Sequence, residues 1–460
     1  MSTRSGGLLE LVARGKKDVF FHSNPVVSFF HSVYVRATPF TKEIHVTKPR
    51  NIPEWGKWVD FDLDHRGDMV KHVHLRLELP SWLPASVQAM NQTGLVTYDV
   101  SGTTYGYCNN IGFQILESIQ FFQDQVLVQE HYGEHLDWRL QQLYPYAETK
   151  LIGEIIGHRD ETPLAIGRSL NSCYLRIPIP ILGWQSRSDP GLPMVALKGE
   201  RFRIRIHLRN LEDVIVSSDG RISPCPWGKP LRIQRTKGGP IDTSYTALPI
   251  SCMKTIGISL ETTQVYLPAD VQMFLQAQTI RIPFQSVQFQ QYTLEDNAMT
   301  AASLNPSIQY KFALPMEFSG SACCMLLGFR SEASTCAGQR TYLNSPIGSI
   351  RMNIANIDRV KQWPIQVFRE VTGYWKHPRI GLTDSLPREV YSLTLGGFEN
   401  GYPMGTINFS RAVDPTLFVT LNAMDYDPRN ISRKTFALLY AESWNIYTIA
   451  QGKGSIMFDE

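Results

Sequence analysis

The chain has 460 residues, 43% hydrophobic and 19% charged, which gives enough apolar side chains for two packed domains and excludes a disordered protein. Lys and Arg number 45 against 42 Asp and Glu, so the surplus of positive charge is too small for a general nucleic-acid binder. No apolar run reaches the roughly 20 residues that span a bilayer, and the first residues lack the apolar core of a secretory signal.

Polar and apolar residues alternate in several segments along the chain. The clearest are residues 72–79, 201–209 and 308–314, and each places apolar side chains on one face only. Such alternation is typical of half-buried antiparallel strands. Shorter apolar segments at 115–122, 126–128, 417–421 and 436–440 are separated by turn residues, as β-sandwiches require. The sequence therefore predicts an all-β protein.

Only one helix stands out, over residues 131–144, where Leu136, Leu140 and Leu143 recur at helical spacing before Pro145. A shorter helical turn is expected to begin at Asp270. With so few helices, folds built from alternating strands and helices are excluded.

A stretch rich in proline and glycine, residues 217–246, interrupts the strand pattern. Pro and Gly at this density indicate an inter-domain linker. We therefore expect a first β domain over 25–216 and a second over 247–460, preceded by an N-terminal arm, 1–24.

The seven cysteines are scattered and form no CxxC pair, so a structural zinc site is not expected. Adjacent Cys323 and Cys324 would point to opposite faces of a strand. These thiols are expected to be reduced and mostly buried in a protein assembled in the cytosol.

His72, His74 and Glu78 have the spacing of the metal-binding signature of cupins, which are β-barrels. However, aliphatic residues occupy the alternate positions of the strand and have the stronger claim on the core, since each contributes about 1.5–3 kcal/mol when buried. The histidines should therefore face outward, beside Arg76, whose charge opposes a cation. We expect a strand surface and no metal or other cofactor.

Arginines alternate with apolar residues over 201–209 and form the densest positive feature: Arg201, Arg203, Arg205 and Arg209. Guanidinium groups form planar pairs with carboxylates, so these residues are candidates for a subunit or domain interface, with at least two pairing to acids of the second domain or a neighbouring subunit. The alternative is an exposed strand face whose charges prevent edge-to-edge association. No interleaved aromatic residues for stacking bases accompany them, and no direct nucleic-acid contact is expected.

The sequence contains no GxSxG, P-loop, GxGxxG or HExxH motif, and an enzyme is not expected. Three sequons occur, at Asn91, Asn408 and Asn430, of which Asn91 and Asn430 are candidates for glycosylation.

Five segments in order along the chain resemble the major capsid proteins of nucleo-cytoplasmic large DNA viruses. The first is the opening, Gly6-Gly-Leu-Leu-Glu-Leu-Val-Ala followed by Asn24-Pro-Val-Val-Ser-Phe-Phe. The others are Glu130-His-Tyr-Gly-Glu-His-Leu-Asp, Pro190-Gly-Leu-Pro-Met-Val-Ala-Leu, Asn400-Gly-Tyr-Pro-Met-Gly-Thr-Ile-Asn-Phe-Ser-Arg and Trp444-Asn-Ile-Tyr. The resemblance covers essentially the whole chain.

The resemblance implies two consecutive eight-stranded antiparallel jelly rolls that form a homotrimeric, pseudo-hexagonal capsomer of an icosahedral shell. Implied partners are neighbouring capsomers, minor capsid and penton proteins, and also the internal viral membrane, with assembly in the host cytoplasm or virus factory. The arm outside both rolls would supply the contacts of Leu8, Leu9, Leu11, Val12, Lys16 and Lys17 to such partners.

Three alternatives stay open. A divergent minor or scaffolding double jelly-roll capsid protein is suggested by Lys16-Lys17, Met404 and Ala412-Val413, which depart from the family pattern. A cupin-like metalloenzyme would use His72, His74 and Glu78. A jelly-roll lectin would use exposed aromatic residues such as Trp227 or Trp375.

Overall fold

The computed structural model of the chain describes ten longer stretches and several short ones. The longer stretches are residues 38–79, 105–143, 174–182, 191–210, 256–294, 309–331, 347–364, 390–395, 402–422 and 435–458. The short ones are 86–91, 94–99, 153, 155–158, 213–217, 230–234, 241–247, 367 and 397–399. Within these residues the fold consists mainly of antiparallel strands, and the all-β prediction is confirmed.

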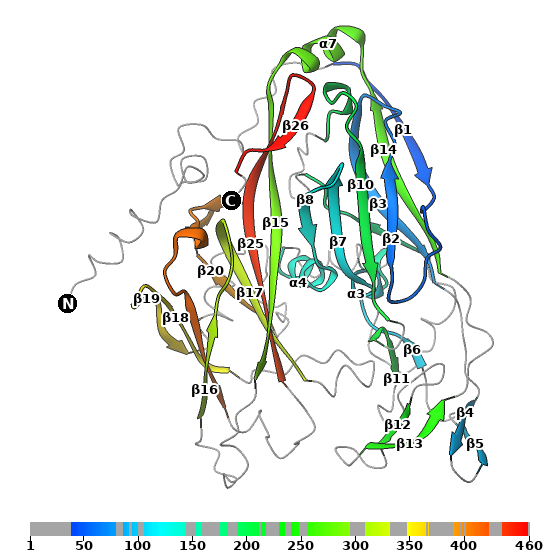
Figure 1. The fold of residues 1–460 in the computed structure, drawn as a ribbon, viewed down its shortest axis with the longest axis vertical. Helices are drawn as coiled ribbons and strands as arrows, with labels where there is room; N and C mark the ends of the chain where they lie inside the picture. Colours follow the sequence, from blue (N-terminus) through cyan, green and yellow to red (C-terminus); the bar gives the residue numbers. More distant parts are fainter. Residues whose placement is uncertain are drawn as a thin grey trace.

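The first jelly roll consists of two four-stranded antiparallel sheets packed face to face (Figure 1). One sheet has the order β1 (Thr41–Thr47), β14 (Gly257–Tyr266), β3 (Met69–Glu78) and β9 (Tyr174–Pro178). The other has the order β2 (Trp58–Leu63), β10 (Phe202–Leu208), β7 (Leu116–Gln123) and β8 (Val126–His131). Leu75 and Leu77 of β3 meet Phe61 and Ile204 of the opposite sheet in one core, because each strand buries every second residue.

The second jelly roll stands beside the first, with its long strands running along the same axis of the molecule (Figure 1). Its larger sheet contains β15 (Ile280–Leu294), β25 (Thr435–Ala450), β17 (Ser321–Ser331) and β20 (Val390–Thr394), with β23 (Ile407–Asn408) beside β17 and β26 (Lys453–Ile456) beside β25. The facing sheet has the order β16 (Gln309–Pro315), β24 (Thr416–Asn422), β18 (Ile347–Ile354) and β19 (Ile357–Pro364). Together the two sheets enclose a separate apolar core.

The predicted boundary between the two rolls must be moved toward the C-terminus. Strand β14 was assigned to the second domain, yet it pairs with β1 on one side and with β3 on the other and completes a sheet of the first roll. The predicted linker at 217–246 contains β12 (Pro230–Gln234) and most of β13 (Ile241–Ala247), which form a small sheet with β4 (Ser86–Asn91) and β5 (Gly94–Asp99). Its Pro and Gly residues therefore flank strands of a side sheet, and we place the junction at helix α7 (Ala269–Ala277).

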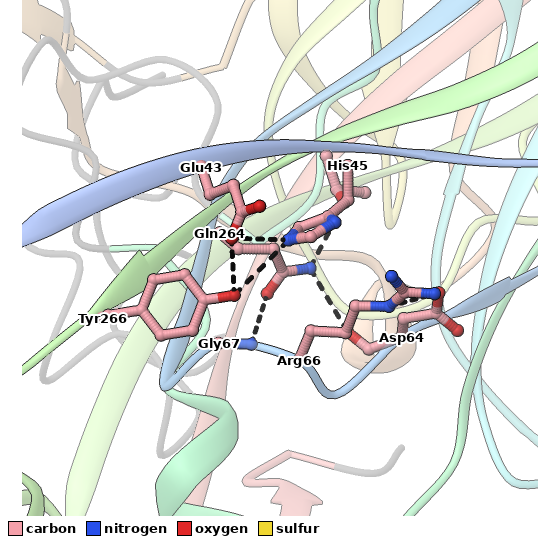
Figure 2. Close-up of polar contacts among 8 residues, drawn as sticks. Glu43, His45, Asp64, Arg66, Gly67, Gln264 and Tyr266 are labelled. Carbon is pink, nitrogen blue, oxygen red and sulfur yellow. Dashed lines mark hydrogen bonds and ion pairs between the residues drawn. The ribbon is translucent and has the colours of Figure 1, made fainter.

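A buried glutamine anchors the loop between β2 and β3 onto β14 (Figure 2). Gln264 is fully buried; its side chain donates to the carbonyl of Asp64 and accepts from the amide of Gly67, at 3.2 Å each. Beside it, the Tyr266 hydroxyl donates to Glu43 at 3.0 Å and lies 3.4 Å from the His45 ring. Burying an amide side chain costs free energy unless it is hydrogen-bonded, so these two bonds favour the position in which the loop meets Gln264.

Helices are few among the described residues, and none is long and apolar enough to cross a membrane. The predicted helix is present as α4 (Gly133–Leu143), and the predicted turn at Asp270 is α7. A further short helix is α3 (Ile111–Gln114). In Figure 1, α4 lies between the two rolls. Cys108, Cys323 and Cys324 are buried and form no disulfide, as expected from the sequence.

Candidate interaction surfaces

The outer face of β3 carries the three residues of the cupin-like motif. Val73, Leu75 and Leu77 are buried in the first core, while His72 and Glu78 are exposed, so the strand has the predicted orientation. Glu78 lies opposite Gly257, whereas His74 lies opposite Glu261, four residues further along β14. Within the described residues, no group of three or more His, Cys, Asp or Glu side chains could hold a metal ion.

His74 lies beside an ion pair that joins two neighbouring strands. Arg176 of β9 forms an ion pair with Glu261 of β14, and strand β3, which carries His74, lies between these two strands. Burial of the ring lowers the pKa of His74 to about 4, and the Arg176 guanidinium lowers it further against the opposing effect of Glu261. His74 is therefore a neutral imidazole at neutral pH, in a face where arginine and glutamate already satisfy each other.

Arg201, Arg203 and Arg205, in and beside β10, contact residues of the first roll. Arg205 forms a two-point pair with Asp60 of β2, at 2.8 and 3.1 Å, and the pKa of Asp60 falls mainly because of this hydrogen bond. Arg203 lies over the Phe122 ring of β7, at 5.1 Å from its centroid. The backbone amide of Arg201 donates to Asp124 at 3.2 Å. On this face Arg205 has an acidic partner, whereas Arg203 packs on an aromatic ring.

Arg209, just beyond β10, lies 3.6 Å from Glu134 of α4, and both side chains are largely buried. Within the subunit, the carboxylates that Arg205 and Arg209 contact come from β2 and α4 and not from the second roll. A pleated sheet places charges of neighbouring strands directly opposite, which makes Asp60 the nearest partner of Arg205. A role of these residues between subunits stays a prediction.

A buried polar network joins α4 of the first roll to β25 of the second. Glu442, fully buried, accepts from His135 at 2.8 Å and lies 3.3 Å from the Arg139 guanidinium. Burial by itself would raise the pKa of Glu442, but Arg139 and the hydrogen bond from His135 outweigh it and lower the pKa to about 2. Tyr440, also on β25, donates to Glu134 at 3.1 Å.

The same contact has a closely packed apolar part. The Trp138 ring is buried between α4 and β17, and it lies so close to Gly328 that a Cβ there would be 2.5 Å from the ring. Its other neighbour is the Tyr440 ring, edge-on with centroids 5.2 Å apart. A glycine is therefore required at position 328 for the helix to approach the second roll.

The edges of the two rolls also meet directly. The Gln129 side chain of β8 donates to the carbonyl of Gln285 on β15 at 2.6 Å, and the amide of Glu130 donates to the Ser286 hydroxyl at 3.3 Å. The amide oxygen of Gln129 in turn accepts from the backbone of Leu182. Strands β8 and β15 are thus joined by side-chain contacts and not by a continuous β-ladder. These contacts protect both edge strands from pairing with strands of other molecules.

Sequence reasoning found the helix but not its role as a contact between the rolls. The signal was present in the composition of α4, where Glu134, His135, Asp137 and Arg139 surround Trp138 and all five are buried. Asp137 accepts hydrogen bonds from Asn110 and Gln114 at 2.6 and 2.7 Å, so the face turned to the first roll is polar as well. A helix without an exposed polar face indicates burial on all sides.

Several predicted residues fall outside what can be described. The arm residues Leu8, Leu9, Leu11, Val12, Lys16 and Lys17 lie outside the described residues, as do Trp227, Trp375 and Asn430. Asn91 ends β4, opposite Gly94 of β5. Asn408, the third sequon, is only 1% exposed and is closed to a glycan in the folded chain.

Residues 28–237 match a protein-family model described as the N-terminus of major capsid proteins. Probable capsid protein 4 of Acanthamoeba polyphaga mimivirus is 29% identical over 217 residues, which make up 45% of this chain and 39% of that protein. Capsid protein 1 of the same virus is matched over 37% of its length, so the alignment spans about two fifths of these two relatives. The major capsid protein of Pyramimonas orientalis virus is 21% identical over 98% of this chain and 99% of its own length.

Solved structures extend the likeness of fold to nearly the whole chain. The capsid of the virus PBCV-1 superposes with a TM-score of 0.67 at 14% identity, over 94% of this chain and all of that chain. The Faustovirus major capsid protein superposes with a TM-score of 0.59 at 12% identity, over 92% and 93% of the two chains. At identities of 12–14%, the superpositions show a common fold. The likeness to capsid proteins in sequence comes from the family model and the relatives. Over residues 28–237 the chain thus matches the N-terminal part of major capsid proteins, and over nearly its whole length it has the double jelly-roll fold of the capsid proteins of large DNA viruses.

Proposed function

We propose that the chain is a non-enzymatic shell subunit that forms homotrimers of pseudo-hexagonal outline, which tile an icosahedral capsid. The observation that carries this proposal is the agreement of fold with the PBCV-1 capsid over 94% of the chain. Three copies of a subunit with two similar upright sandwiches give six similar lobes around one axis, and six lobes pack hexagonally.

The contact between the rolls supports a building role. A subunit that must present two lobes in fixed positions needs a rigid junction, and α4 supplies one through a buried ion pair to Glu442 and a ring packed onto Gly328. Within the described residues, Arg205 on the outer face of β10 is paired with Asp60 inside the subunit. The surfaces that bind neighbouring capsomers, minor capsid and penton proteins would then lie on the loops and the N-terminal arm.

Light scattering and negative-stain imaging of the purified full chain test the proposal. We expect the mass of three chains and particles with a six-lobed outline. A monomer at micromolar concentration would contradict the homotrimer and favour the minor or scaffolding capsid protein instead.

The arm is tested separately by deleting residues 2–20. We expect soluble trimers that fail to assemble further when mixed with the wild-type partners in infected-cell extract, because Leu8, Leu9, Leu11 and Val12 would contact those partners. Loss of the trimer itself in this deletion would place the arm within a core. The proposed assembly site is the host cytoplasm or virus factory, which immunogold labelling of infected cells would test.

A further inference from the structure

His131 is a buried histidine whose ring has no partner. It ends β8, two positions before α4 begins, and is 4% exposed. Neither ring nitrogen has a hydrogen-bond partner. A buried imidazole with two unsatisfied nitrogens is unusual, since burying an unpaired polar group costs about 1–3 kcal/mol.

The ring lies close to the contact between the rolls, near enough to His135 of α4 and Glu442 of β25 for their charges to act on it. Its neighbour Tyr132 packs against Phe289 of β15 and Tyr440 of β25, at centroid distances of 5.4 and 5.7 Å. On the other side, Gln129 donates to β15. Protonation of His131 therefore places a charge inside the contact between the rolls, where there is no carboxylate bonded to it.

The other titratable groups of this contact have hydrogen bonds or ion pairs of their own. They are Glu134, His135, Asp137 and Arg139 on α4, Tyr440 and Glu442 on β25, Cys323 and Cys324 on β17, Arg209 after β10, and Glu130 and Tyr132 beside His131. His135 and Arg139 both contact Oε1 of Glu442, and neither oxygen of Glu442 is hydrogen-bonded to the His131 ring. His135 opposes a positive charge on His131, while Glu442 favours it.

We propose that the junction of α4 with the second roll is an acid-sensitive latch, which stays closed only while the His131 ring is uncharged. At neutral pH the neutral ring stays buried at the position opposite Ile119 of β7. In acid, protonation favours any state in which α4 has moved away from β25 and the ring meets water. The opening stays local to α4, because Ile282 and Phe284 of β15 and Tyr447 and Ile449 of β25 belong to the first core and still join the rolls.

The direction and size of the effect follow from proton linkage. Burial lowers the pKa of His131 from 6.5 to about 3, so the open state binds the proton more tightly than the closed state. The closed contact has its full stability above pH 6.5 and loses it as the pH falls toward 3. For these two pKa values, opening of the latch should be about thirtyfold more frequent at pH 5 than at pH 8.

Hydrogen exchange of the full chain, followed by mass spectrometry of peptides from α4 and corrected for the intrinsic pH dependence of exchange, measures this opening. We expect protection of α4 to fall about thirtyfold from pH 8 to pH 5 in the wild type and by about twofold or less in His131→Leu. The matched control, His74→Leu on the outer face of β3, should keep the thirtyfold change. An equal fall in His131→Leu, or none in the wild type, would overturn the proposal.

A second measurement decides the matter if His131→Leu does not fold. Exchange of the histidine C2 hydrogen in the wild-type protein reports the pKa of each ring separately. A titration midpoint for His131 below about 4 supports the latch, and one near 6.5, the ordinary value, overturns it.

Discussion

The outer face of β10 and the contact between α4 and β25 use the same residue types in opposite surroundings. In the first, Arg205 and Asp60 form a two-point pair with about a third and a fifth of their side chains exposed. In the second, Arg139 and Glu442 meet with 2% and 0% exposed. Water screens the first pair and cannot reach the second, so removal of one partner leaves an unsatisfied charge only in the second. The buried charges at the junction of the rolls therefore contribute more to stability than the arginines of β10.

The largest effect is expected when the buried carboxylate becomes an amide. Glu442→Gln leaves the Arg139 guanidinium buried without its counter-charge, and we expect the free energy of unfolding to fall by about 3–5 kcal/mol in guanidinium titrations. The matched control is Asp60→Asn on the β10 face, which should cost about 0–1 kcal/mol. Equal losses for the two variants would remove the distinction between the two regions.

The sequence predicted which strand residues are buried, but it could not predict contacts between residues far apart in the chain. The alternation in β3, β10 and β16 predicted which side chains enter the cores, because burial of every second residue is a local property. Strand β14 was assigned to the wrong roll, since the pairing with β3, whose central pair Glu261 and His74 is 187 residues apart in sequence, leaves no local trace. The contact of His135 with Glu442 joins residues 307 positions apart, and no spacing rule reaches that far.

The next largest effect concerns the close approach of α4 to β17. Gly328→Ala places a methyl group against the Trp138 ring, and we expect a loss of about 1–3 kcal/mol in the same titrations. Adding Trp138→Phe, which removes the part of the ring that is closest, should recover part of this loss. If the second change makes the first worse, the ring and the glycine do not pack as described.

A smaller effect is expected on the outer face of β3. The pKa of His74 is lowered to about 4, mainly by burial, so its contribution to stability is present above pH 6.5 and lost as the pH falls toward 4. His74→Gln should flatten the acid-induced loss of stability by at most about 1 kcal/mol, because the ring is partly open to solvent. Melting temperatures of wild type and variant between pH 7 and pH 4 check this, and parallel curves would argue against it.

The smallest effect is expected for Arg205→Gln, at about 0–1 kcal/mol, with no change in the number of chains in the particle. Light scattering and thermal melts measure both quantities. Loss of the trimer in this variant would show that Arg205 contributes to a contact between subunits. The pairing of Arg205 with Asp60 inside the first roll argues against such a contact.

Calorimetric unfolding of the wild-type chain tests most directly whether the two rolls act as one rigid block. The buried contact predicts a single cooperative transition at pH 8, which splits into two when Glu442→Gln weakens the junction. Two separate transitions in the wild-type protein at pH 8 would show that the rolls unfold independently and would contradict the account.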